Sequence, residues 1–156
     1  MLELNIPGCK TLPLRFLVLD YNGTIACDGH LIPGVKDQLT ELSKILAIHI
    51  VTADTFGSVQ IELKGLPCEI AVIGKEEQAR AKADYVRKLE AKQTVCIGNG
   101  RNDALMFKEA GLGIVVIQEE GSAVETFLAA DIVTRNIQDA LDLLRNPLRL
   151  TATLRS

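Results

Sequence analysis

Short runs of apolar and β-branched residues alternate along the chain with longer segments of helical periodicity. This alternation is typical of an α/β domain in which helices flank a doubly wound, mostly parallel sheet. We expect strands over Arg15–Asp20, Ile45–Thr52, Glu69–Ile73, Thr94–Gly98, Gly113–Ile117 and Ile132–Thr134. The remaining periodic segments predict helices over Val35–Lys44, Phe56–Leu63, Glu76–Lys92, Asp103–Ala110, Ser122–Ala129 and Ile137–Leu144.

The length fits one domain with its own core, since the chain has 156 residues, of which 47% are apolar and 24% are charged. We predict a single domain over residues 1–156, with a core over about 15–145. Residues 146–156 are predicted to form a C-terminal extension, either docked on the surface or left as a mobile tail.

Charge and hydropathy disfavour two classes of partner. The formal net charge of -3 provides no global positive field for nucleic acid. The longest apolar runs are far shorter than the roughly 20 residues that a membrane-spanning helix needs. The amino terminus lacks the pattern of a signal peptide, so we expect a cytoplasmic protein without a membrane partner.

The four cysteines are widely spaced, and the chain has only two histidines, His30 and His49. No pair of cysteines has zinc-like spacing, so we expect reduced thiols. A catalytic cysteine needs a histidine partner, and the sequence around His30 and His49 does not identify either residue as such a partner. A thiol-based mechanism is therefore disfavoured.

Three predicted strands end abruptly in polar side chains and small residues: Leu19-Asp20-Tyr21-Asn22-Gly23-Thr24, Val51-Thr52-Ala53-Asp54 and Gly98-Asn99-Gly100-Arg101-Asn102-Asp103. Ligands of open parallel sheets bind at the carboxyl ends of the strands, where these loops converge. A carboxylate such as Asp20 can attack a phosphoryl group and form an acyl phosphate. Thr24, Thr52 and a downstream lysine could bind the oxygens of the phosphoryl group, while a carboxylate in a distant loop holds a metal ion.

Each of these residues also has a purely structural interpretation. Asp20 could be a turn residue, and Asn22-Gly23 is a favoured two-residue hairpin turn. Thr52 could cap the following helix, and Lys82 could be a solvated helix residue. The segment Gly98–Asp103 also resembles half of a dinucleotide fingerprint, but Asp103 stands where that fingerprint needs Gly or Ala, which disfavours dinucleotide binding.

The ordered set of motifs resembles the haloacid dehalogenase superfamily of phosphotransferases, and within it the phosphorylation domain of P-type ATPases. Asp20–Thr24 resembles the first motif of that family, Thr52 the second, Lys82 the third and Gly98–Asp103 the fourth. The similarity continues through 110–114 and 129–133, and so covers roughly residues 15–145.

The resemblance implies a role for each matching residue, with Mg²⁺ as cofactor. Asp20 would be the nucleophile and a metal ligand, and the site would further comprise Asn22, Thr52 and Lys82 as catalytic residues, Gly23, Thr24, Ala53 and Asn102 as substrate-binding residues, and Asn22 (through its carbonyl), Asn99 and Asp103 as metal ligands. Lys75, which also follows a predicted strand, is the alternative to Lys82 as the phosphate-binding lysine.

Two positions depart from the family pattern. Asn22 stands where most phosphatases of the superfamily have an Asp that protonates the leaving group and then activates water. An amide cannot transfer a proton near neutral pH, so general acid–base catalysis should be missing, as it is at this position of P-type ATPases. Asn99 replaces the Asp that usually begins the fourth motif, and the lost charge should weaken Mg²⁺ binding.

The gaps between the motifs leave no room for a cap domain. The segment Ile25–Pro33 should form a small flap beside the site. An uncovered site excludes water poorly, and capless relatives use a neighbouring subunit or a large substrate as the lid. The predicted substrate is a phosphorylated small molecule or macromolecule, and the chain could be a homo-oligomer.

Three functions therefore stay open. The first is a Mg²⁺-dependent phosphatase or phosphotransferase that hydrolyses its aspartyl-phosphate slowly. The second is a non-catalytic phosphate-binding or regulatory module, which Asn22 and Asn99 favour. The third, hydrolytic dehalogenation, is disfavoured because the threonine, lysine and glycine pattern is closer to the ATPase branch.

Overall fold

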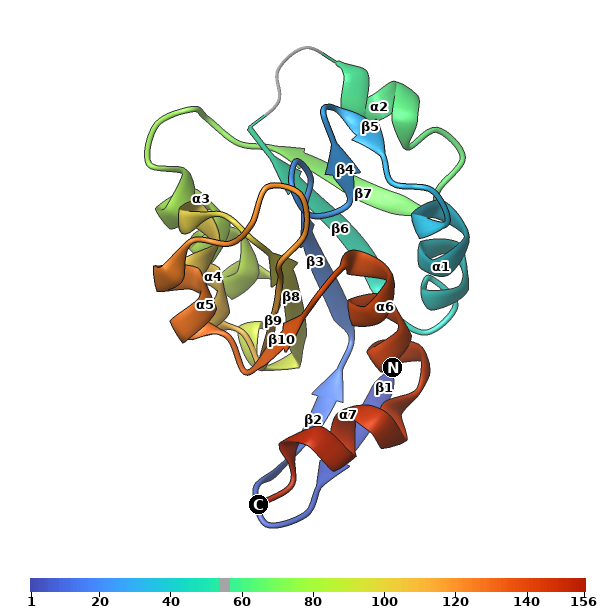
Figure 1. The fold of residues 1–156 in the computed structure, drawn as a ribbon, viewed down its shortest axis with the longest axis vertical. Helices are drawn as coiled ribbons and strands as arrows, with labels where there is room; N and C mark the ends of the chain where they lie inside the picture. Colours follow the sequence, from blue (N-terminus) through green and yellow to red (C-terminus); the bar gives the residue numbers. More distant parts are fainter. Residues whose placement is uncertain (54–56) are drawn as a thin grey trace.

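A six-stranded sheet forms the centre of the computed structural model, which describes residues 1–53 and 57–156 (Figure 1). All its strands are parallel, in the order β10-β9-β8-β3-β6-β7. The predicted α/β class and all six predicted strands are confirmed, with bounds β3 (Phe16–Asp20), β6 (Ala47–Thr52), β7 (Cys68–Val72), β8 (Thr94–Gly98), β9 (Leu112–Val116) and β10 (Ile132–Thr134). Strand β3 lies between β6 and β8, so Asp20 lies at the centre of the carboxyl edge.

Helices cover both faces of this sheet. They are α1 (Val35–Leu42), α2 (Ser58–Glu62), α3 (Gln78–Lys88), α4 (Ala104–Glu109), α5 (Val124–Ala129), α6 (Ile137–Arg145) and α7 (Pro147–Leu154). The helix predicted over Glu76–Lys92 is shorter at both ends, because Glu77 and Glu90 adopt left-handed backbone conformations with φ of 50° and 66°. Phe56, the predicted start of the second helix, lies outside the described residues.

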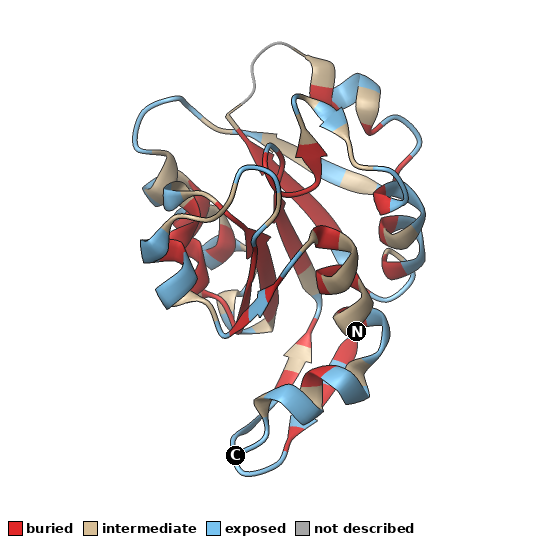
Figure 2. Cartoon of the chain, viewed as in Figure 1, coloured by how far each residue is buried: buried red, intermediate tan, exposed pale blue. Residues whose placement is uncertain are grey.

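Strand β3 is buried on both faces, as its unbroken apolar run requires. Leu17 and Leu19 belong to the larger core cluster, which also contains residues of α1 and α6. Val18 belongs to a second cluster, with residues of α3 and α4. Figure 2 shows the buried strands between the two helical layers. This double burial fixes the direction of β3 and therefore the position of its last residue, Asp20.

An antiparallel hairpin precedes the sheet and was not predicted. Its strands β1 (Leu2–Ile6) and β2 (Lys10–Leu14) carry buried leucine and isoleucine side chains at alternate positions. Helix α7 packs against β1 and buries Leu150. Figure 1 shows that this hairpin and α7 extend together beyond the end of the sheet opposite the carboxyl edge.

The flap predicted over Ile25–Pro33 is a small hairpin of β4 (Ala26–Cys27) and β5 (His30–Leu31). Asp28 and Gly29 form its turn with φ of 51° and 82°, and positive φ at both central residues is the mark of a type I′ turn. The structural alternative for Asn22-Gly23 is therefore wrong, because the hairpin turn lies six residues later. In the described residues between β3 and α3, only β4, β5, α1, β6, α2 and β7 occur, so no cap domain is inserted there.

No helix in residues 1–53 and 57–156 combines the length and hydropathy required to cross a membrane.

His49 is a buried titratable residue on β6, on the side of the sheet that faces α3. The residue is 4% exposed, and its Nδ1 lies 2.9 Å from the Tyr85 hydroxyl and 3.5 Å from a Glu69 carboxylate oxygen. Burial lowers the pKa of His49 below its usual value of 6.5, although the Glu69 carboxylate opposes this shift. The folded protein therefore holds His49 neutral where an unfolded chain would bind a proton.

We predict that the contribution of His49 to the free energy of unfolding decreases as the pH falls below 6.5, the pKa of an unperturbed histidine, while protonation of the buried Asp103, whose pKa is raised to about 6, acts in the opposite direction. The reason is that the unfolded state then binds the proton more readily than the folded state. One proton gives a slope of at most about 1.4 kcal/mol per pH unit. Urea unfolding between about pH 7.5 and 5.5 measures how the free energy of unfolding changes with pH. His49→Gln should reduce the slope and His30→Gln, at an exposed position, should retain it; equal slopes in all three proteins would contradict the prediction.

Candidate active site

A cavity of about 630 Å³ opens at the carboxyl edge of the sheet, where β3, β6 and β8 end. Loops from different strands converge at this edge, so residues far apart in the sequence share one cavity. Its walls are Asp20, Asn22, Gly29, Thr52, Ala53, Ser58, Lys75, Gln78, Lys82, Asn99, Gly100, Asn102 and Glu120. Gly29 and Gly100 lie in the predicted flap and in the fourth motif, and eight others were singled out individually from the sequence: Asp20, Asn22, Thr52, Ala53, Lys75, Lys82, Asn99 and Asn102.

Lys82 is the buried cation of this cavity. Helix α3 places its Nζ 2.6 Å from Asp20 Oδ1 and 2.7 Å from Asp103 Oδ1, and only 1% of the residue is exposed. Burial alone lowers the pKa of Lys82, but the Asp103 and Asp20 carboxylates outweigh this effect, and the pKa is raised. Lys82 therefore stays charged and holds a carboxylate from β3 and another from the loop after β8.

Asp103 is fully buried, and both of its carboxylate oxygens accept hydrogen bonds. Its Oδ1 accepts from Lys82, while its Oδ2 accepts from the backbone N–H groups of Asn99 at 3.0 Å and Gly100 at 2.9 Å. Burial and the nearby Asp20 carboxylate raise the pKa of Asp103, and Lys82 opposes this shift. A Cβ at Gly98 would lie 2.6 Å from Asp103 Cγ, so glycine is needed there for this close approach.

Thr24 joins the loop after β3 to the loop after β8. Its hydroxyl lies 3.3 Å from Asp20 Oδ2 and 3.3 Å from Asn99 Oδ1, both of which are acceptors for its single proton. The Asn99 Nδ2 donates to the Gly121 carbonyl at 3.0 Å, which turns its Oδ1 toward Thr24. Gly23 adopts a φ of 79° in this loop. The carboxylate of Asp20 is thus bound on both oxygens, by Lys82 and by Thr24.

The structure brings most of the predicted site residues into one network. Hydrogen bonds or ion pairs connect Asp20, Thr24, Lys82, Asn99 and Asp103, and Asn102 Oδ1 lies 3.4 Å from Lys82 Nζ.

The other predicted residues surround this network. Asn22, Thr52 and Ala53 line the cavity, and Gly23 lies beside Asn99. Lys75 also lines the cavity but is exposed, whereas Lys82 is the lysine bound to Asp20. Asp54, next to Ala53 in the sequence, lies outside the described residues.

Three residues of the cavity wall were missed from the sequence: Ser58, Gln78 and Glu120. Gln78 begins α3, and its Oε1 accepts from Asn102 Nδ2 at 2.7 Å, which no sequence motif indicates. Glu120 follows β9 in the run Gln118-Glu119-Glu120-Gly121, and polar residues after a parallel strand are the signal that could have found it.

The oxygen atoms of the site determine which metal it suits. In the part of the chain that the structure describes, no three His, Cys, Asp or Glu side chains gather as a metal cluster. The Asp20 carboxylate and the Asn99 amide oxygen nevertheless approach the same Thr24 hydroxyl, and carboxylate, amide and backbone oxygens are the ligands of Mg²⁺. This donor set fits a hard divalent cation, with less negative charge than two carboxylate ligands would provide.

Comparison with known sequences finds P-type ATPases and a related phosphatase among the similar proteins. No protein-family model matches the chain. The uncharacterized protein MJ0073 of Methanocaldococcus jannaschii is 49% identical over 84 residues, which cover 53% of this chain and 90% of that protein. A soluble P-type ATPase-like phosphatase of the same organism is 28% identical over 125 residues, which cover 77% of this chain and 45% of that protein. The probable copper-exporting P-type ATPase of Archaeoglobus fulgidus is 30% identical over 106 residues, covering 67% of this chain and 13% of that protein.

Solved structures show the same fold. The cobalt-bound deoxy-D-mannose-octulosonate 8-phosphate phosphatase of Haemophilus influenzae superposes with a TM-score of 0.72 and 14% identity, covering 92% of this chain and 94% of that one. The 3-deoxy-D-manno-octulosonate 8-phosphate phosphatase of Moraxella catarrhalis, in complex with magnesium, phosphate and KDO, superposes with a TM-score of 0.71 and 18% identity. The match covers 91% of this chain and 94% of that one. This chain spans less than half the length of the P-type relatives, but nearly the whole length of these phosphatases. Fold and sequence similarity thus confirm the resemblance to the haloacid dehalogenase superfamily, in a chain with no cap domain inserted in its described residues.

Proposed function

We propose that this chain is a Mg²⁺-dependent phosphatase or phosphotransferase that works through an aspartyl-phosphate on Asp20. The observation that carries the proposal is the placement of Asp20 at the end of the central strand, in a cavity, against the buried ammonium of Lys82. A fixed carboxylate beside a fixed cation suits attack on a phosphoryl group whose negative charge must be neutralised.

In the proposed reaction, the Asp20 carboxylate attacks phosphorus and the leaving group departs with the electron pair of its bond. Lys82 and Thr52 would hold the phosphoryl oxygens, and Gly23, Thr24, Ala53 and Asn102 would contact the substrate. Water would then hydrolyse the aspartyl-phosphate. Because Asn22 cannot transfer a proton, both protonation of the leaving group and activation of water would depend on solvent, which makes turnover slow.

Asp20, the Asn22 carbonyl and Asn99 would hold the Mg²⁺ ion. When bound, Mg²⁺ would neutralise charge that develops on the phosphoryl group. Sequence similarity also predicts Asp103 as a ligand, but Asp103 is fully buried and is not among the residues that line the cavity, and its oxygens accept hydrogen bonds from Lys82 and from two backbone N–H groups. We therefore propose that Asp103 acts as a positioning residue, which holds Lys82 beside Asp20.

The substrate class remains the one expected from the sequence, a phosphorylated small molecule or a macromolecule. Gly29 of the small β4–β5 flap lines the cavity, and no cap domain covers it in the described residues, which leaves space for a large substrate or for a second copy of the chain. Exposed apolar residues of α5, Val124 and Leu128, are compatible with a homo-oligomer. Nucleic acid is not an expected partner, and a cytoplasmic location stays a prediction.

The second candidate function is a non-catalytic phosphate-binding or regulatory module. Asn22 favours it, because the residue lines the cavity at the position where a general acid would be needed. Asn99 favours it too, because its side chain brings no charge to the metal site. Such a module would keep Lys82 and Thr52 as phosphate ligands without turning over a substrate.

Incubation with acetyl phosphate or p-nitrophenyl phosphate tests the first candidate against the second. We expect slow release of phosphate or nitrophenol in MgCl₂ and its loss in EDTA. Intact-mass analysis of each preparation is a necessary control, because Asn22 and Asn99 each precede glycine and deamidation would create carboxylates. Binding of phosphate without any turnover would support the regulatory module and contradict the enzyme.

A further inference from the structure

Glu120 is a cavity residue to which neither the motifs nor the proposed mechanism gives a role. It lies in the loop between β9 and α5 and lines the same cavity as Asp20, Asn22 and Asn99. The residue is exposed, and within the described residues no hydrogen bond or ion pair involves its carboxylate. It therefore brings to the cavity a negative charge that no group of residues 1–53 and 57–156 neutralises by direct contact.

The loop that carries Glu120 is held against the loop that follows Asp20. Gln118 Nε2 donates to the carbonyl oxygens of Gly23 at 2.9 Å and Thr24 at 2.6 Å. On the other side of Glu120, the Gly121 carbonyl accepts from Asn99 Nδ2 at 3.0 Å. The Gly121 N–H bonds back to the Gln118 carbonyl at 2.8 Å and closes the turn. Glu120 is thus positioned by anchors on both sides of it.

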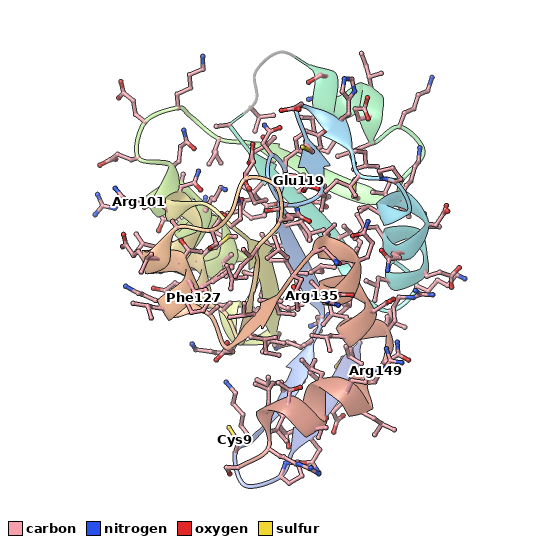
Figure 3. The ribbon with its side chains drawn as sticks, in the orientation of Figure 1. Cys9, Arg101, Glu119, Phe127, Arg135 and Arg149 are labelled. Carbon is pink, nitrogen blue, oxygen red and sulfur yellow. The ribbon has the colours of Figure 1, made fainter. Side chains whose placement is uncertain are left out.

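These anchors bring the Glu120 carboxylate to the point where the side chain of Asn99 approaches the loop after β3. A Cβ added at Gly23 would collide with Glu120 Oε2, and the same Cβ would lie 2.6 Å from Asn99 Nδ2 and 2.9 Å from Asn99 Oδ1. Glu120 and Asn99 therefore converge on one side of Gly23. Figure 3 shows the neighbouring Glu119 at this end of the sheet, far from Cys9 in the N-terminal hairpin.

The position of Glu120 matters because the other side chains of the cavity offer little negative charge to a divalent cation. Asp103 is fully buried and is not among the residues that line the cavity, and Asn99 is neutral, so of these three residues only Asp20 would offer charged oxygen to a divalent cation. Mg²⁺ favours charged oxygen ligands. We propose that Glu120 is the second carboxylate of the cation site and supplies the negative charge that Asn99 lacks. This inference rests on the proposed function, because it assumes that a divalent cation binds beside Asp20.

Thermal unfolding in increasing MgCl₂, at ionic strength held constant with NaCl, tests the inference without measuring activity. A ligand that binds only the folded state stabilises it by RT ln(1 + [L]/Kd), so a tighter-binding protein shows the larger rise in Tm at a given MgCl₂ concentration. We expect Glu120→Gln to weaken Mg²⁺ binding by at least about tenfold relative to the wild type. Glu119→Gln is the matched control, because it removes the same charge from the adjacent exposed residue, and should bind Mg²⁺ as the wild type does.

Other results of the MgCl₂ titration would overturn either the role of Glu120 or the metal site itself. Equal Mg²⁺ affinity of the wild type and Glu120→Gln would overturn the role of Glu120 and leave the proposed function intact. Equal weakening in both variants would also overturn it, because the effect would then be long-range electrostatics. Absence of any Mg²⁺-dependent shift in the wild type would contradict the metal site itself, and with it both proposals. Equal Tm values of the three proteins in EDTA would verify that the substitutions leave the fold unchanged.

Discussion

Asp20→Asn should reduce turnover of acetyl phosphate by at least about 10³-fold, because the amide is not a nucleophile toward phosphorus. The substitution keeps the shape of the side chain and removes only its charge. Lys82 would still have the Asp103 carboxylate at 2.7 Å, so we expect the variant to fold. Phosphate release over time, at matched protein concentration and in MgCl₂, measures the loss.

Asp37→Asn provides the control for Asp20→Asn. Asp37 is an exposed residue in the first turn of α1 and is not among the residues that line the cavity, so its loss should leave turnover unchanged. Near-UV circular dichroism of both variants would establish that each retains the native fold. Undiminished turnover by Asp20→Asn would remove Asp20 from the mechanism.

Asn22→Asp should accelerate hydrolysis by roughly 10²- to 10⁴-fold, the usual contribution of a positioned general acid or base. Asn22 is exposed and lines the cavity, so an aspartate there would reach solvent and substrate alike. It could protonate the leaving group and then activate the water that hydrolyses the aspartyl-phosphate. Steady-state turnover of p-nitrophenyl phosphate measures the gain.

Asn5→Asp adds the same charge on the exposed face of β1 and should not change the rate. If Asn22→Asp turned over substrate no faster than the wild type, the slow step would lie elsewhere, and the missing acid–base group would not explain low activity. A gain confined to Asn22→Asp would show that the fold and the phosphate-binding groups are competent for catalysis.

The sheet could be predicted from the sequence because its strands are apolar runs bounded by polar or small residues. Phe16–Leu19 is buried on both faces, which leaves a continuous hydrophobic signal. The hairpin β1–β2 was missed although Leu2, Leu4 and Ile6 alternate with exposed residues, the period of a half-buried strand. Such a short alternation is a weak local signal. The apolar face of β1 packs against α7, which comes from the other end of the chain.

The site was predictable to the extent that its residues belong to motifs at strand ends. Asp20, Lys82 and Asp103 were singled out from their motifs, but spacing does not show that Lys82 binds both carboxylates or that Asp103 bonds two backbone N–H groups. Those contacts depend on how α3 packs beside the loop after β8. Glu120 was missed because two adjacent glutamates resemble solvated surface charge until the loop that carries them is placed.

Phosphorylation of Asp20 itself is the most direct test of the central claim. Wild-type protein incubated with acetyl phosphate and MgCl₂, then quenched in acid, should gain the mass of one phosphoryl group. Peptide mapping should place this group on Asp20, and hydroxylamine should release it, as expected for an acyl phosphate. A phosphoryl group found on another residue, or turnover without any adduct on Asp20 in rapidly quenched samples, would contradict the account.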